Sequence, residues 1–86
     1  MNGAATVRER LERALSDRYR EVHVDFGPQR AGRISGILVS PDFEGLTTDQ
    51  RQDDLWDVVR VTLGAESSDV STIVTLTPDE YEDLRP

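Results

Sequence analysis

The sequence predicts an α+β fold, a two-layer sandwich in which helices cover one face of a three-stranded sheet. Three observations predict it. Apolar residues recur at helical spacing in two segments, short segments rich in β-branched residues alternate with polar ones, and a capping signal built on threonine precedes each helical segment. The 86 residues have room for one small domain, which we place over residues 1–86 with residues 1–5 as a disordered lead.

The first predicted element is a helix that begins at Thr6 and ends near Asp17. Thr6 and Glu9 have the spacing of a capping box, in which each side chain accepts a hydrogen bond from the backbone N–H of the other residue. Glu9 also stands four residues before Arg13, the favourable order for an ion pair on a helix. One face of the helix is apolar and consists of Val7, Leu11, Ala14 and Leu15.

Two strands are predicted next, joined as an antiparallel hairpin. In residues 20–26, three apolar residues alternate with polar ones, which is typical of a half-buried strand. A loop containing Gly and Pro leads to a second strand over residues 34–39. Gly36, in the middle of that strand, predicts a bulge or a close approach of the backbone. The residues of the first strand that share one face are Val22, Val24 and Phe26.

A long helix is predicted over residues 48–63. Thr47 and Gln50 form a second capping signal before it, and Gly64 is a natural C-terminal stop. The polar residues 65–69 are expected to form a loop. The apolar face of the helix is formed by Leu55, Trp56, Val59 and Leu63.

Residues 70–76 are rich in β-branched side chains and predict the last strand. Thr77 at the N-cap and Pro at the next position predict a short helix that runs through Leu84. We expect Tyr81 and Leu84 to return to the core.

One face of the predicted sheet is expected to stay open. Two helices and a short third one can cover one face of three strands, so the other face meets water or a partner. The strand 70–76 alternates between two sets, one of Val70, Thr72, Val74 and Leu76 and the other of Ser71, Ile73 and Thr75. We expect Ile73, with Ile37 or Val39, to contribute to the open face.

The charges are unevenly distributed along the chain. Residues 1–40 carry seven Arg and five acids, a net charge of +2, whereas residues 41–86 carry three Arg and twelve acids, a net charge of −9; together these give −7. Clustered basic residues are what binds a phosphate polyanion, and the second half would repel one. Three overlapping interpretations stay open: a solvated acidic face, an acidic face for a basic protein partner, and a nucleic-acid surface on Arg8, Arg10 and Arg13.

The composition excludes several classes of protein. There is no cysteine, which excludes a disulfide scaffold, a catalytic thiol and any cluster held by the chain's own thiolates. No nucleophile–base set or phosphate-binding glycine loop is present, so we do not expect an enzyme. No apolar run reaches the roughly 20 residues that span a bilayer, and the N-terminus lacks the features of a signal peptide. We expect a cytoplasmic protein that does not bind a membrane.

Several short motifs together resemble the BolA-like family. They are Glu21–Val24, Phe43–Gly45, the pairs Arg51-Gln52 and Leu55-Trp56, and Thr77–Tyr81, and the likeness extends from about Val7 to Leu84. The first motif and Gln52 are similar to the acid-stress-induced subgroup. The resemblance implies a fold similar to the class II KH domain, a regulatory role in stress response and a protein partner such as a monothiol glutaredoxin.

The sequence departs from this family at the position of a metal ligand. Family members that share a [2Fe–2S] cluster with a monothiol glutaredoxin use a histidine just before the last strand, and the alignment places Asp69 there, or Ser68 or Ser71 if the loop slips. His23 is the one remaining ligand candidate, against the alternative of a surface histidine paired with a neighbour. We therefore expect no bound cofactor, and a shared cluster is disfavoured. The Gly-x-x-Gly loop of KH domains is also absent.

Two groups of residues are candidate partner-binding sites. Phe43, Glu44 and Gly45 form a possible docking loop, with the alternative that Phe43 fills the edge of the core and Gly45 permits the turn. Asp53 and Asp57, with Asp54 between them, form a possible acidic docking surface, with the alternative of a solvated helix face. Trp56 is expected to lie in the core.

These observations predict a non-catalytic BolA-like interaction and regulatory module. The alternatives are a KH-like nucleic-acid-binding regulator and an accessory subunit that docks its acidic helix on a basic partner. We expect a monomer or weak dimer whose partner is a protein, either glutaredoxin-like or basic, rather than a nucleic acid.

Overall fold

The computed structural model describes residues 6–27 and 32–84 of the chain. The disordered lead predicted for residues 1–5 and the loop residues 28–31 lie outside the described residues. The order of the helices and strands is the predicted one. They are α1 (Val7–Arg18), β1 (His23–Phe26), β2 (Ile34–Val39), the 3-10 turn η1 (Pro41–Phe43), α2 (Thr48–Leu63), the 3-10 turn η2 (Gly64–Asp69), β3 (Val70–Leu76) and α3 (Pro78–Leu84).

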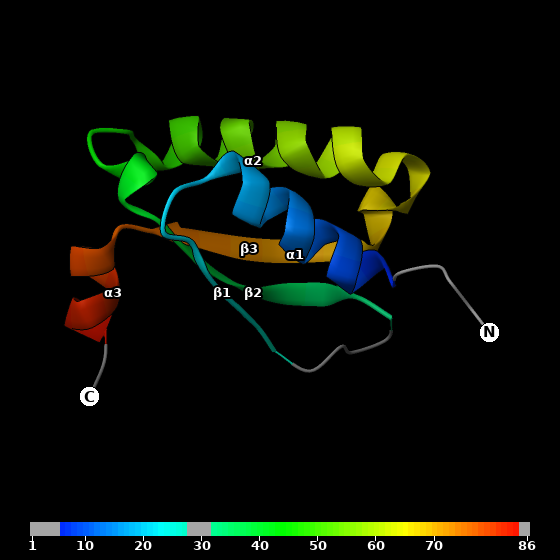
Figure 1. Ribbon diagram of the computed structural model, residues 1–86, viewed down its shortest axis with the longest axis horizontal. Helices are drawn as coiled ribbons and strands as arrows, with labels where there is room; N and C mark the ends of the chain where they lie inside the picture. Colours follow the sequence, from blue (N-terminus) through cyan, green and yellow to red (C-terminus); the bar gives the residue numbers. More distant parts are fainter. Residues whose placement is uncertain (1–5, 28–31, 85–86) are drawn as a thin grey trace.

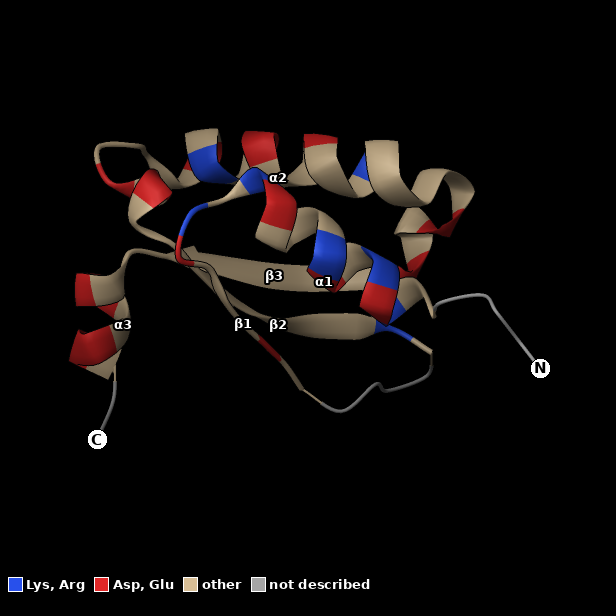
Figure 2. Ribbon diagram, in the orientation of Figure 1, with Lys and Arg blue, Asp and Glu red and all other residues tan. Residues whose placement is uncertain are grey.

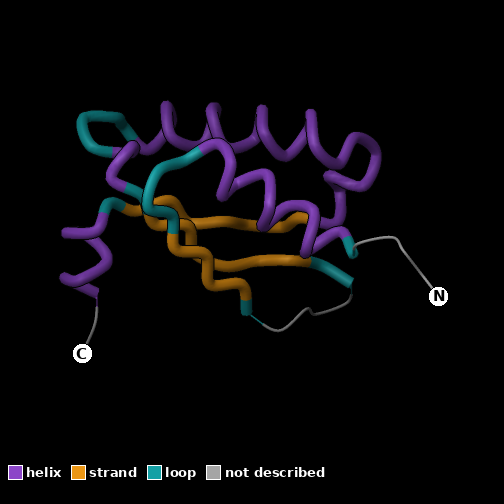
Figure 3. Tube along the Cα trace, viewed as in Figure 1, coloured by secondary structure: helices purple, strands orange, loops and turns teal. Residues whose placement is uncertain are grey.

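The three strands form one mixed sheet in the order β1-β2-β3. β1 and β2 are antiparallel, which confirms the hairpin, and β2 and β3 are parallel. α1 and α2 lie in a layer over one face of the sheet, as Figures 1 and 3 show. The expectation that the third helix covers the same face is wrong, since α3 lies beyond one end of the sheet, away from α1 and α2 (Figure 1).

All three predicted capping signals form. The Thr6 hydroxyl accepts the Glu9 N–H, and the Glu9 carboxylate accepts the Thr6 N–H at 2.9 Å. Thr47 and Gln50 make the same reciprocal pair before α2. Before α3, the Thr77 hydroxyl accepts the Glu80 N–H at 3.2 Å and the Glu80 carboxylate accepts the Thr77 N–H at 2.8 Å. Each box satisfies backbone donors that a helix N-terminus otherwise leaves unpaired.

The core lies between the two long helices and the inner face of the sheet. It is formed by apolar residues of α1, α2 and all three strands, together with Phe43. Val22, Val24 and Trp56 are partly buried against it, as their sequence patterns predict. Its fully buried large side chains are Phe43, Leu11, Leu15, Ile34, Leu38, Leu55, Ile73 and Val59.

The prediction that Ile73 faces outward is wrong. The pairing of β2 with β3 passes from Ile34↔Val70 to Ser35↔Thr72, so Ser71 is an extra residue in β3. Such a bulge reverses the alternation of the side chains that follow it. Ile73 is therefore 1% exposed in the core, and Val74 is 44% exposed on the other side.

Four smaller differences separate the structure from the prediction. Glu21 has a φ of +47°, outside extended backbone, so β1 begins at His23 instead of residue 20. α1 continues to Arg18, one residue beyond Asp17. Residues 65–69, predicted as a loop, belong to the 3-10 turn η2. Leu84 does not return to the core, because α3 lies beyond one end of the sheet, away from α1 and α2. The Leu84 side chain is 67% exposed.

Candidate functional site

The face of the sheet opposite α1 and α2 is here called the outer face. Register fixes its members, because residues paired across the strands lie on the same side. Ile37 pairs with Asp25 and with Val74, and Val39 pairs with His23 and with Leu76. The expectation that Ile37 or Val39 belongs to this second face is thus confirmed for both by register, although Val39 is only 5% exposed.

His23 lies at the α3 end of the outer face. Its ring is exposed and its centroid lies 5.5 Å from that of Tyr81, at a tilt of 46°. Tyr81 is thereby half-buried against the outer face instead of entering the core. His23 is thus an exposed histidine with Tyr81 as its neighbour.

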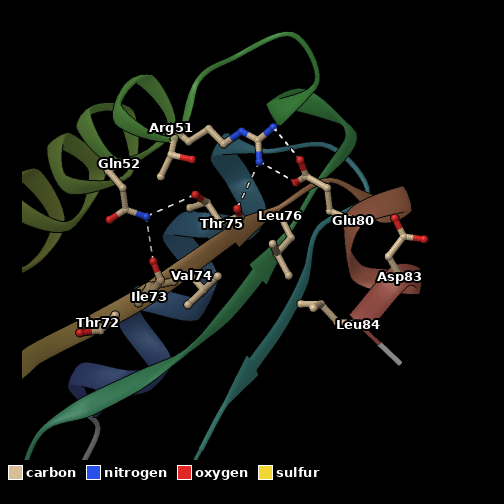
Figure 4. A pocket seen from close by; sticks show the side chains of 11 residues that line it. Arg51, Gln52, Thr72, Ile73, Val74, Thr75, Leu76, Glu80, Asp83 and Leu84 are labelled. Carbon is tan, nitrogen blue, oxygen red and sulfur yellow. Dashed lines mark hydrogen bonds and ion pairs between the residues drawn. The ribbon is translucent and has the colours of Figure 1, made fainter. Parts of the chain in front are cut away.

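Arg51 joins the edge of the sheet to α3. Its side chain is only 10% exposed. The guanidinium donates to the Leu46 carbonyl at 3.0 Å. It also donates to the Thr75 carbonyl at 3.3 Å and to the Glu80 carboxylate at 2.6 Å (Figure 4). A buried arginine needs such partners, since its donors have lost water. This one side chain therefore fixes the start of α2, the end of β3 and the position of α3.

Gln52 covers the next position along the same edge. Its amide donates to the Ile73 carbonyl at 2.9 Å and to the Thr75 hydroxyl at 3.3 Å, and its oxygen accepts the Trp56 indole N–H at 3.1 Å. β3 forms one edge of the sheet. The edge carbonyls of Ile73 and Thr75 therefore accept hydrogen bonds from side chains of α2 instead of from another strand. Sequence reasoning missed this role of Arg51 and Gln52. The signal for it was Arg51 itself, a charged residue one helical repeat before Leu55 on the buried stripe.

Glu80 carries the strongest carboxylate perturbation at this site. The side-chain hydrogen bond from Arg51, followed by the backbone hydrogen bond from Thr77, lowers the pKa of Glu80 from 4.5 to about 2. Both interactions favour the charged form. A folded pKa below the unfolded value means that the carboxylate stabilises the fold above about pH 4.5, and that this stabilisation is lost as the pH falls toward 2.

We expect Glu80→Gln to destabilise the domain at neutral pH but not in acid. Glutamine can still accept the Thr77 N–H, so the variant removes the charge and keeps the cap. The free energies of unfolding of the two proteins should differ near pH 7, and the difference should shrink below about pH 4.5 and vanish as the pH falls toward 2 in urea titrations. Asp53→Asn, at an exposed carboxylate on α2, is the control. Its difference in free energy of unfolding from the unmodified protein should not change with pH in this way. A difference that is the same at both pH values would contradict the role given to the ion pair.

We expect Arg51→Met to destabilise the domain by about 2 kcal/mol, because it leaves the buried Thr75 carbonyl without this donor and breaks the bond to Glu80. Arg60→Met is the matched control on the same helix. Arg60 is 60% exposed and pairs with Asp57 three residues away, so its loss should cost less than about 0.5 kcal/mol. Urea unfolding followed by circular dichroism compares the two, and equal effects would argue against a special role for Arg51.

The candidate docking loop is mostly a structural element. Phe43 is fully buried, with its ring centroid 4.9 Å from that of Tyr19, so it offers no side-chain surface to a partner. Glu44 is exposed, and Gly45 is exposed with a φ of +82° that favours glycine. Of the three candidate residues, Glu44 and Gly45 are the ones that a partner can reach.

The three aspartates of α2 do not converge. Asp53 is exposed, and Asp57 is exposed and pairs with Arg60 at 2.5 Å. Asp54 turns toward α1, where it accepts hydrogen bonds from the Arg18 guanidinium and, at 2.6 Å, from the Tyr19 hydroxyl. Burial, with the Asp54 hydrogen bond, raises the pKa of Tyr19 well above its usual value. Asp54 therefore fastens the two long helices together, and Asp53 and Asp57 are left on the surface.

The three arginines of α1 do not form a basic patch. Arg8 donates to the Phe26 carbonyl at 2.9 Å, and Arg10 pairs with Glu66. Arg13 is exposed and lies near Glu9, whose pKa is lowered mainly by hydrogen bonds from Thr6. Figure 2 shows basic and acidic positions intermingled along this helix. Arg13 is the exposed arginine of the three, and its charge acts on the carboxylate of Glu9.

The two positions that bear on a metal lie at opposite ends of the sheet. Asp69 directly precedes Val70, which pairs with Ile34, whereas His23 pairs with Val39 at the other end of β2. Ile34 and Val39 are five residue steps apart along β2, which separates these two ends by about 17 Å. Among the residues that the structure describes, no three His, Asp or Glu side chains are grouped so that they could hold a metal ion.

This architecture is similar to that of known proteins. The fold and its open face define a small α+β module, one sheet face packed by two helices and the other left exposed. The structure of a bolA protein homologue from Coxiella burnetii matches at 27% identity, with a TM-score of 0.51, over 95% of this chain and 99% of that chain. The chain is therefore BolA-like, which confirms the resemblance seen in its motifs.

A second solved structure is also similar to this chain. A bol-like protein from Babesia bovis is 28% identical over 95% of this chain and 96% of that chain, with a TM-score of 0.46. No family model matches the sequence, and no curated protein does. No helix in residues 6–27 or 32–84 is long and apolar enough to cross a bilayer.

Proposed function

We propose that this chain is a non-catalytic, BolA-like protein-interaction module that acts as a cytoplasmic regulator and binds a monothiol glutaredoxin. The observation that carries the proposal is the likeness to the Coxiella protein in both sequence and fold over nearly the whole of the two chains. The open outer face supports it, because three strands packed on one side leave apolar surface that a partner can cover.

The donor set of the chain does not fit the cluster that some relatives share with a glutaredoxin. Iron–sulfur clusters are held by thiolates, with imidazole as the usual nitrogen ligand. The chain has no cysteine and one histidine, and His23 is an entire strand length away from Asp69. In the proposed complex, contacts between protein surfaces supply the affinity and this chain supplies no cluster ligand.

The proposal is tested with the purified chain and a monothiol glutaredoxin from the same organism. We expect the two to form a complex in light scattering after size exclusion and in calorimetry, with the glutaredoxin free of cluster. His23→Ala should leave the affinity unchanged, because the ring is given no ligand role. Absence of a complex would contradict the proposal. A complex that needs a loaded cluster and is lost in His23→Ala would contradict its cluster-independent form.

A further inference from the structure

A groove of about 470 Å³ runs along the edge of β3, between α2 and α3. Its apolar lining includes Val74, Leu76 and Leu84, which lie on the same side of the strand in Figure 4. Val74 is 44% exposed and Leu84 is 67% exposed, and both are among the few large hydrophobic residues that the described part of the chain leaves open to water. An aliphatic side chain from a partner would cover this surface.

The edge of the groove is already closed against an added strand. Strand addition uses the outward carbonyls and N–H groups of an edge strand. Here the Ile73 carbonyl accepts from Gln52 and the Thr75 carbonyl accepts from Arg51. An incoming strand would have to displace both side chains, one of which also holds Glu80. The groove therefore favours an occupant that inserts a side chain over one that extends the sheet.

The negative charge around the groove favours a positively charged occupant. α3 has the sequence PDEYEDL, with four acids and no base. The cation nearest the groove, Arg51, is 10% exposed and already paired with Glu80. Asp79 and Asp83 remain exposed on α3, and Asp83 lines the groove. A second copy of this chain, with a net charge of −7, would be repelled, whereas a basic segment would be attracted.

We propose that the groove binds a basic segment of a partner protein, which places one aliphatic side chain against Val74 and Leu84 and flanking Lys or Arg residues near the carboxylates of α3. This surface deepens the interaction function proposed above and rests on it. It differs from the acidic surface of Asp53 and Asp57, which lies on α2 and lacks the adjoining apolar floor of Val74 and Leu84.

Two variants remove the two parts of the proposed surface. Leu84→Ser removes an exposed apolar contact at the end of α3, and Asp83→Arg reverses the charge beside it. Each has a matched control outside the groove. Val61→Ser removes a side chain that is 87% exposed on α2, and Asp53→Arg reverses an exposed acid on the same helix. All four positions are exposed, so the variants should keep the fold, which circular dichroism checks.

The probe is the capped peptide Lys-Lys-Ser-Ile-Ser-Lys-Lys, compared with the same peptide carrying Ser in place of Ile. We expect backbone amide shifts in the NMR spectrum to concentrate in β3 and α3 with the Ile peptide. Leu84→Ser and Asp83→Arg should each weaken binding by about tenfold, and the two control variants by less than about twofold. Equal binding of the two peptides, or a loss in Asp53→Arg as large as in Asp83→Arg, would overturn the proposal.

The same four variants are then tested in the glutaredoxin complex. If the complex forms and is weakened only by Leu84→Ser and Asp83→Arg, the groove is the site used. If it forms and these two variants leave it unchanged, this surface is wrong while the interaction function stands. If no complex forms, the proposed function fails, and peptide binding alone decides whether the groove takes basic segments. A dimer of the chain that Leu84→Ser dissociates would favour a second copy and overturn the choice of a basic partner.

Discussion

Gly36→Ala is expected to destabilise the domain by about 3 kcal/mol, the upper part of the range for overpacking. A Cβ at Gly36 would lie 2.4 Å from the Asp25 carbonyl oxygen and 2.7 Å from the Phe26 Cα. Both atoms belong to the backbone of β1, so no rotation of a side chain can relieve the contact. Relief requires β1 to move away from β2, which breaks the ladder that pairs Phe26 with Gly36. Urea unfolding measures the loss.

Gly27→Ala is the matched control for this variant. Gly27 lies just after β1, and a Cβ there would meet nothing within 4 Å. Its N–H donates to the Ser35 carbonyl at 3.0 Å, a bond that alanine keeps. The control should therefore change stability by less than about 1 kcal/mol, and it can stabilise through the unfolded state. If both variants behaved alike, the close approach of the two strands would not be what requires glycine at position 36.

The features that sequence predicts well here are those decided within a few residues. The pairs Thr6 with Glu9 and Thr47 with Gln50 form as expected, because a capping box needs only four consecutive residues. The stop of α2 at Gly64 is equally local, since its φ of +56° suits glycine. Helical periodicity then located the apolar faces of the two long helices.

The features that sequence reasoning missed depend on residues far apart in the chain. The extra residue Ser71 is defined only by how β3 pairs with β2, and a single residue of that kind reversed the predicted faces of Ile73 and Val74. Arg51 lies on the buried face of α2, where its guanidinium is satisfied by partners from the loop before α2, from β3 and from α3. No local pattern brings these three partners together, so the candidate groove was visible only in the folded chain.

Phe43→Ala is expected to have the largest effect on stability, a loss of about 3–5 kcal/mol. Phe43 is the largest fully buried side chain and its ring lies 4.9 Å from that of Tyr19. Because the ring is fully buried, its removal leaves a cavity as well as losing buried apolar surface. For a domain of this size the loss is a large part of the total stability.

Two comparisons separate this structural role from a docking role. Leu46→Ala, in the same connector but 37% exposed, should cost about 1 kcal/mol or less, and Phe43→Leu should recover most of the stability lost in Phe43→Ala because it refills the volume. If Phe43 served the partner, Phe43→Leu would fold well and fail to bind the glutaredoxin. We expect Phe43→Leu instead to bind normally, because the side chain at this position lies beneath the surface that a partner can reach. A folded Phe43→Leu protein that fails to bind would show that this loop takes part in the interface.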